Sequence, residues 1–180
     1  HIQRSGAGSR TQVVFASSGA QEVWVRGYTT GAWQPWRRIL HLGNLVGTVS
    51  QSGGVPTGAV IERGSNANGQ FVRFADGTMI CRHAIALGSR IAFGAGTYAD
   101  PWRTAGSDWT FPAAFSSAPA VTTISALNST SGALRNHCIG MRSVSATSAV
   151  AIQAVALSSL NTDEPVTAHV TAIGRWFEPA

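Results

Sequence analysis

The carboxylates that could do chemistry are few and widely spaced in this 180-residue chain. A glycosidase needs two carboxylates held roughly 5 to 10 Å apart. Among the eight acidic residues, Asp100 and Asp108 bracket the segment DPWRTAGSD and could meet across a loop. Asp163 and Glu164 are adjacent and would point apart in a strand. The alternative is that these acids are solvated turn residues, so a hydrolytic pair is one hypothesis beside a structural one.

No motif for metal binding or nucleophilic catalysis accompanies these acids. The HExxH, GxSxG and P-loop patterns are all absent from the sequence. The five histidines are far apart, at positions 1, 41, 83, 137 and 169. A lone histidine in a strand is usually solvated or hydrogen-bonded, and the alternative is metal binding by three copies around a threefold axis. We therefore expect no enzymatic activity, no cofactor and no bound metal.

One loop-rich segment, Tyr98–Pro112, mixes aromatic rings with carboxylate and guanidinium groups. Aromatic rings cover the apolar C–H faces of sugars, while charged groups fix the hydroxyls. The mixture predicts a glycan-binding site. The candidate glycan-binding residues are Tyr98, Asp100, Trp102, Arg103 and Asp108. The alternative is structural, with Trp109, Phe111 and Phe115 in a core and Trp102 as a packing lid.

A second aromatic stretch, EVWVRGYTTGAWQPWRRIL, holds three of the six tryptophans. It could be a binding face, a nucleic-acid site or the core of a very small module. A module of about 45 residues needs large rings to build a core, which favours a scaffold role for Trp33 and Trp36. Arg26 and Arg37 are expected to stack on these rings.

The charge and composition narrow the possible partners. The net charge of +5 comes from thirteen arginines without any lysine, and only Arg37 and Arg38 are adjacent. Phosphate-tracking surfaces usually cluster their basic residues, so we expect no nucleic-acid partner. Leu, Ile, Val and Phe make up only 40 of the 180 residues. A single copy would have a thin core, which predicts oligomerisation.

Period-2 alternation and turn residues dominate, so the sequence predicts an all-β fold. In Val23–Tyr28 alternate residues form two faces, Thr29-Thr30-Gly31 forms a turn, and Ala32–Leu40 returns as a second strand. Pro35 lacks an N–H and should interrupt that return. Asp76-Gly77 predicts a two-residue type I′ hairpin in which Phe74 faces Met79 and Val72 faces Cys81.

Five further segments with strand patterns follow residue 89 and predict an antiparallel sandwich or barrel. They are RIAFGAG, AVTTISAL, NHCIGMRSV, SAVAIQAVAL and PVTAHVTAIGRWF. In the last, small residues share one face, which would allow close approach of another sheet or subunit. That face carries Val166, Ala168, Val170, Ala172 and Gly174.

Cysteines and hydropathy add little about function. Cys81 and Cys138 have no partner at metal spacing, and two buried free thiols are the simplest expectation, although a pairing stays open. No run of 18 apolar residues exists, so we expect no membrane insertion. The chain begins at His1 rather than Met, so we expect further sequence before it.

Taken in order, these motifs resemble a known family. EVWVRGYTTGAWQPWRRI is similar to the small knob modules of phage tail fibres and R-type pyocin fibres, whose Arg-x-Tyr and Trp-x-x-Trp pattern is matched by Arg26, Tyr28, Trp33 and Trp36. SGGVPTGAVIERGSNANGQFVRFADGTMIC resembles a segment near the ends of tail fibres of phages and gene transfer agents. WTFPAAFSSAPAV with AIGRWF is similar to their C-terminal sandwich, akin to the trimeric H-type lectin fold.

The resemblance implies a knob-like β module at 1–45, an extended linker and β-hairpin at 46–84, and a C-terminal antiparallel β-sandwich at 85–180. It implies a homotrimeric tail-fibre tip on a virion or phage-like particle, which joins other tail or baseplate proteins through its N-terminal part. Such a tip would be a non-enzymatic adhesin for a bacterial surface glycan. The alternatives are a purely structural fibre module and a polysaccharide depolymerase. The resemblance assigns no site residues.

Overall fold

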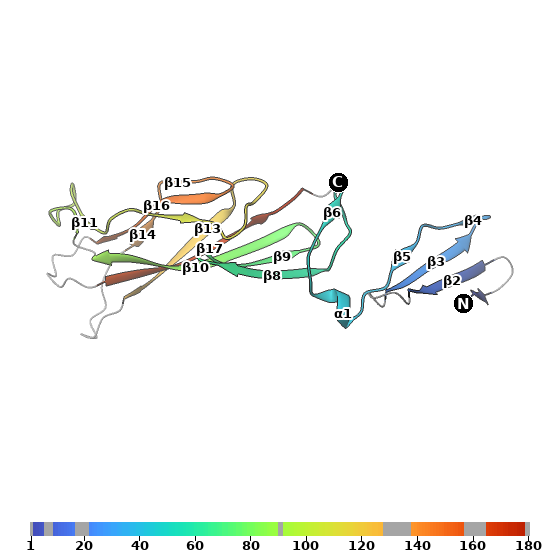
Figure 1. Ribbon diagram of the computed structural model, residues 1–180. Coiled ribbons are helices and arrows are strands. Elements are labelled where there is room, and N and C mark those ends of the chain that lie inside the picture. Colours follow the sequence, from blue (N-terminus) through green and yellow to red (C-terminus); the bar gives the residue numbers. More distant parts are fainter. Residues whose placement is uncertain are drawn as a thin grey trace. The chain divides into compact units, whose positions relative to one another are not determined.

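The secondary structure of the described residues consists mainly of antiparallel β-strands, as the alternating pattern predicts (Figure 1). The computed structural model describes residues 2–5, 9–16, 22–89, 92–127, 138–156 and 165–178. Contacts divide the chain into two compact units, His1–Leu45 and Val46–Ala180. Within the described ranges the one helix is α1 (Leu42–Leu45), and no described helix is long and apolar enough to cross a membrane.

The 1–45 unit is a single antiparallel sheet in which β3 is central. Its strands are β1 (Ile2–Ser5), β2 (Ser9–Phe15), β3 (Val23–Thr29), β4 (Ala32–Trp33) and β5 (Arg37–Arg38). Thr30 and Gly31 join β3 to β4 with φ angles of 52° and 81°, which are the positive values that a type I′ turn requires. Pro35 lies in the gap between β4 and β5, so the expected interruption by proline is confirmed.

The larger sheet of the 46–180 unit has the strand order β13-β17-β10-β9-β8. Its strands are β8 (Ile61–Asn66), β9 (Gly69–Phe74), β10 (Thr78–Ser89), β13 (Ala120–Leu127) and β17 (Pro165–Arg175). β10 pairs with β17 from Thr78 to Ser89 and runs through residues 84 and 85 without a break. The hairpin segment and the sandwich, expected as separate parts, therefore share this sheet.

The second layer of this unit is built around β16 (Ser148–Ala156), which pairs with four short strands. They are β11 (Trp102–Arg103), β12 (Ser107–Thr110), β14 (Cys138–Gly140) and β15 (Ser143–Val144). A small hairpin of β6 (Gln51–Ser52) and β7 (Val55–Pro56) precedes β8. The segment expected as an extended linker thus contains a pair of strands of its own.

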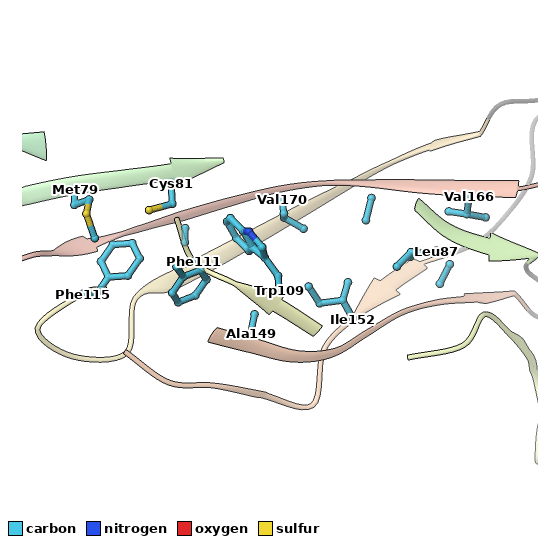
Figure 2. Packing of buried hydrophobic residues seen from close by; sticks show 13 residues of the cluster. Met79, Cys81, Leu87, Trp109, Phe111, Phe115, Ala149, Ile152, Val166 and Val170 are labelled. Atoms are coloured by element: carbon cyan, nitrogen blue, oxygen red, sulfur yellow. The ribbon is translucent and has the colours of Figure 1, made fainter. Parts of the chain in front are cut away.

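The core lies between these two layers (Figure 2). Met79 and Phe115 lie beside one another at one end, and Leu87 and Val166 lie at the other. Trp109 is the largest fully buried side chain, and its ring meets the ring of Phe111 edge-on with centroids 4.8 Å apart. The structural alternative for Trp109, Phe111 and Phe115 is therefore confirmed.

The strand predictions hold where the alternation is strong. β13 and β16 occupy the predicted AVTTISAL and SAVAIQAVAL segments, and the small-residue face of β17 is buried from Val166 to Ala172. That face packs against the β16 layer of the same chain, because Ala and Val leave room for the opposite sheet. NHCIGMRSV instead forms the two short strands β14 and β15, and its first two residues lie outside the described ranges.

The strand predicted over RIAFGAG is wrong for its described part. Residues 92–96 form an irregular loop with one isolated bridge, between Phe93 and Arg103. Gly94 and Gly96 take φ angles of +93° and +74°, which an extended strand does not allow. Glycine at alternate positions favours a loop here over a strand.

The predicted hairpin around Asp76 and Gly77 is confirmed. Its predicted type I′ turn is wrong, and its predicted strand register is wrong by one residue. Cys81 faces Phe71 and Ile80 faces Val72. The loop holds three residues, Gly77 alone has a positive φ (+93°), and its N–H donates to the Phe74 carbonyl over 3.0 Å. This is a type I turn with a bulged glycine, which needs left-handed backbone at one position instead of two.

The C-terminal residues close over this turn. The Trp176 backbone N–H donates to the Gly77 carbonyl, and its indole N–H donates to the Phe74 carbonyl, both over 2.9 Å. The Arg175 guanidinium donates to the Asp76 carbonyl over 2.5 Å. The Asp76 carboxylate in turn accepts from the Thr78 N–H over 2.8 Å. Contacts from the other end of the chain therefore stabilise the observed turn.

Both cysteines are free, but only Cys81 is buried; Cys138 is exposed, so the expectation of two buried thiols is half wrong. Burial raises the pKa of the Cys81 thiol from 9.0 to about 11, although the Ala113 backbone and Arg73 act in the opposite direction. The folded protein therefore keeps this thiol protonated where the unfolded chain would ionise it.

We expect a thiol reagent at neutral pH to label Cys138 rapidly and to label Cys81 only after unfolding. The Cys138→Ser variant should then be unreactive while folded. Because the Cys81 pKa is higher in the folded state, its contribution to stability is complete below pH 9 and decreases toward pH 11. Denaturation series at pH 8 and pH 10.5 measure this. Rapid labelling of folded Cys138→Ser would contradict the prediction.

Candidate functional site

The strongest candidate site is a loop between Phe93 and Arg103, which projects beside β11 from one end of the 46–180 unit (Figure 1). Phe93 and Arg103 exchange backbone hydrogen bonds of 3.1 and 2.9 Å at its base. Inside the loop, Ala95 and Thr97 donate their N–H groups to the Asp100 carbonyl over 3.0 and 3.2 Å. The loop is therefore held by its own backbone.

Two glycines allow the loop to close so tightly. A side chain at Gly94 would collide with the Pro101 carbonyl, and one at Gly96 would collide with the Trp102 indole. Both glycines have positive φ angles, a conformation that glycine adopts at little cost. Trp102 is consequently half-buried against the loop backbone, which agrees with a packing role for one side of its ring.

The loop contains four of the five residues predicted to bind a glycan. Tyr98 is 93% exposed, and Arg103 donates from Nη1 to Oδ1 of Asp100 over 2.7 Å. Trp102 and Arg103 follow each other in β11. An exposed phenol ring, an ion pair and a half-buried indole thus share one short loop. Such a set offers both an apolar surface and charged hydrogen-bonding groups to a ligand.

Asp108 has a different environment. Its Oδ1 accepts the backbone N–H of Ala151 over 2.8 Å, where β12 and β16 have an irregular register. Ala151 has a φ of 54°, so the Asp108 carboxylate stabilises a strained backbone position. Arg103 pairs with Val155, four residues along β16 from Ala151, which separates the two places by about 13 Å.

The aromatic stretch of the 1–45 unit forms a layer on one face of its sheet. The Arg26 guanidinium carbon lies 4.6 Å from the ring centroid of Trp33 and 4.4 Å from that of Trp36. Stacking of Arg26 is thereby confirmed. The prediction of a buried tryptophan core is wrong for this chain by itself, because Trp33 is half-buried, Trp36 is 37% exposed, and no described side chain of residues 10–16 or 22–45 is buried.

Among the described residues, His83 and His169 line one hollow of about 540 Å³, but the described histidines do not form a metal-binding group. His83 stacks on Trp109 with ring centroids 6.5 Å apart, His41 accepts the Gly43 N–H at Nδ1, and His169 is exposed on β17. Among the described residues no three His, Cys, Asp or Glu side chains are grouped as metal ligands would be. Residues 1, 137, 163 and 164 lie outside the described ranges.

The sequence interpretation missed a hollow of about 660 Å³ on the outer face of the larger sheet. Its apolar lining includes Val72, Phe74 and Ile80, with Arg63 and Arg82 beside them. Ile173, which faces Ile80 on β17, is 49% exposed. The signal in the sequence was the run TMICRH, in which apolar residues occupy both faces of one strand.

No protein-family model matches the sequence, and a search of curated proteins finds no match. Among solved structures, a C-terminal fragment of the P. aeruginosa R1 pyocin fibre is 18% identical over 96% of this chain and 56% of its own length, with a TM-score of 0.47. An N-truncated R1-type pyocin tail fibre is 22% identical over 61% of this chain and 82% of its own, with a TM-score of 0.43. An N-truncated R2-type fibre is 16% identical over 97% of this chain and 81% of its own, also with a TM-score of 0.43.

All of these structures are pyocin tail-fibre fragments. This is the family that the sequence motifs resemble. The chain spans 56% of the R1 fibre fragment, little more than half of its length.

Proposed function

We propose that this chain is the receptor-binding part of a tail fibre on a phage or phage-like particle, a non-enzymatic adhesin for a bacterial surface glycan. The observation that carries the proposal is the 93–103 loop, in which an almost fully exposed Tyr98 precedes by two residues Asp100, the partner of Arg103 in an ion pair. The ring can cover an apolar sugar face, and the charged pair can bind hydroxyl groups. A loop that is already held by its own backbone hydrogen bonds loses less entropy on binding than an unconstrained one.

Contacts of the two acids favour an adhesin over a depolymerase. Asp100 is paired with Arg103, and Asp108 is engaged by the Ala151 backbone. The partner of Asp100, Arg103, faces Val155, whereas Asp108 binds Ala151 four residues away along β16, so the two carboxylates are held by different parts of this strand. In a purely structural module this loop would need only small, uncharged residues. Here it carries aromatic and charged groups.

We infer that the working form is a homotrimer, joined to other tail proteins through its N-terminal side. On the outer face of the larger sheet, Val72, Ile80 and Ile173 form an apolar row in which Ile173 is 49% exposed, and this row offers surface for neighbouring copies to cover. Three identical weak sites on one particle gain about 10² to 10⁴ in attachment strength through effective concentration.

The test measures the mass of the purified chain by light scattering and then its binding to lipopolysaccharide from the strain that adsorbs the particle. We expect a trimer, saturable binding and unchanged polymer length. Tyr98→Ala and Arg103→Ala should each weaken binding about tenfold, while Val55→Ala, an exposed apolar residue of β7, should not.

Three results would count against this proposal. A chain that is monomeric at micromolar concentration would rule out the proposed trimer. Shortening of the lipopolysaccharide would establish a depolymerase. Saturable binding that neither Tyr98→Ala nor Arg103→Ala weakens would place the glycan site outside the loop. A trimer that binds no lipopolysaccharide would favour the structural module.

A further inference from the structure

The 1–45 unit carries a second aromatic surface, separate from the 93–103 loop. We define the arginine–tryptophan face by five residues of its sheet: Val14, Trp24, Arg26, Trp33 and Trp36. Alternation along the strands brings these side chains to one side, since Val14 faces Trp24 across the β2–β3 pair. On the opposite side of β2, Phe15 faces Val23.

Neighbouring groups hold the rings of this face in place. The Trp24 indole N–H donates to Oε2 of Glu22 over 3.1 Å, and the other carboxylate oxygen of Glu22 accepts from Arg38 over 3.2 Å. Arg26 lies against both Trp33 and Trp36, and its Nε donates to Gln12 over 2.8 Å. A surface fixed in this way is preorganised for a rigid ligand.

The rings border a shallow hollow. Val14, Trp24 and Trp36 line a space of about 430 Å³ on this face. Val14 is 43% exposed and Trp36 is 37% exposed, so one apolar ring could lie against both. Exposed indole surface next to fixed polar groups is the chemistry that recognises the C–H face of a sugar.

The excess of positive charge in residues 1–45 favours acidic sugars over neutral ones. Residues 1–45 hold five of the thirteen arginines and only one of the eight acids, Glu22, which is itself ion-paired. Arg26 brings a guanidinium to the ring of Trp36, directly beside the hollow. A ligand with a carboxylate or phosphate would therefore be favoured over a neutral one.

We propose that the arginine–tryptophan face is a second saccharide site, specific for an acidic sugar residue that stacks in the hollow between Trp24 and Trp36. The site goes beyond the proposed function, because it lies in the other unit and uses none of the residues of the 93–103 loop. A hollow that takes one ring suits a saccharide better than a nucleic acid, which needs a continuous basic track. Here only Arg37 and Arg38 are adjacent in sequence.

The test titrates the full chain by calorimetry with three probes: oligogalacturonate, neutral maltohexaose and a thymidine homo-oligonucleotide. Oligogalacturonate should bind saturably and at least about tenfold more tightly than either other probe. Trp36→Ala should weaken its binding about tenfold by removing one wall of the hollow. Val14→Asp should do the same through charge repulsion while keeping an exposed strand position, so folding is preserved.

Phe15→Ala is the matched control, because Phe15 is the next residue of β2, is 69% exposed and points to the opposite side. Its affinity should equal that of the unaltered chain. Tyr98→Ala should also leave oligogalacturonate binding unchanged, so the failure of this site and the failure of the loop site are distinguishable.

Several outcomes would overturn the proposal. One is the absence of saturable oligogalacturonate binding at millimolar concentration. Another is equal affinity for the oligonucleotide with the same dependence on Trp36 and Val14, which would reveal a general polyanion surface. Unchanged affinity in folded Val14→Asp would show that the saccharide binds elsewhere on the chain.

Discussion

Replacing Trp109 by alanine is expected to lower the free energy of unfolding of the 46–180 unit by about 3 to 5 kcal/mol. Trp109 is 2% exposed and touches Phe111 edge-on at the centre of the core. Its indole N–H also donates to the Asn68 carbonyl over 2.8 Å, which fastens the β8–β9 turn to the second layer. Truncation leaves a cavity and removes this hydrogen bond. The total free energy of unfolding of a small domain is typically only about 5 to 15 kcal/mol, so the variant should be close to unfolding.

Urea denaturation followed by far-UV circular dichroism measures the loss. Phe93→Ala is the control, since Phe93 is 52% exposed and its removal should change stability by less than about 0.5 kcal/mol. Trp109→Phe should lie between the two, because it keeps an aromatic ring but not the N–H donor. A Trp109→Ala variant as stable as the unaltered chain would show that the two layers are not held by this core.

Replacing Gly77 by alanine is expected to lower the free energy of unfolding by about 2 to 4 kcal/mol. One part of this loss comes from backbone strain at a positive φ and the other from a steric collision. Gly77 has a φ of +93°, where L-residues are strained. An added Cβ would lie 2.8 Å from the Phe177 carbonyl and 2.7 Å from the Arg175 guanidinium. The variant must therefore displace the C-terminal segment that closes over the turn.

Gly88→Ala separates the two contributions. Gly88 also has a positive φ, +74°, but an added Cβ would meet nothing within 4 Å. It should cost only the backbone penalty of about 1 to 2 kcal/mol. The excess loss in Gly77→Ala, with faster carboxypeptidase cleavage of its C-terminus, reports the displaced segment. Equal losses in the two variants would mean that the C-terminal contacts do not stabilise the turn.

The positions of Asp100 and Asp108 depend on contacts that the spacing of the two residues in the sequence does not contain. Asp100 and Asp108 are eight positions apart, a spacing that allows two residues to meet across a loop. The intervening chain instead enters β11 and then β12, which pair with different parts of β16. Four of the five candidate ligands share the loop because their grouping is local, whereas the place of Asp108 depends on a strand more than forty residues away.

Strand alternation and turn chemistry are encoded by neighbouring residues, so the all-β class, the hairpin at Asp76-Gly77 and the small-residue face of β17 can be predicted from the sequence alone. The register of that hairpin was decided by the tertiary structure. An Asp-Gly pair allows either a type I′ turn or a type I turn with a bulged glycine. Arg175 and Trp176 donate hydrogen bonds to the observed turn from the other end of the chain. Long-range contacts of this kind add free energy to one of two local conformations, and no short stretch of sequence contains that information.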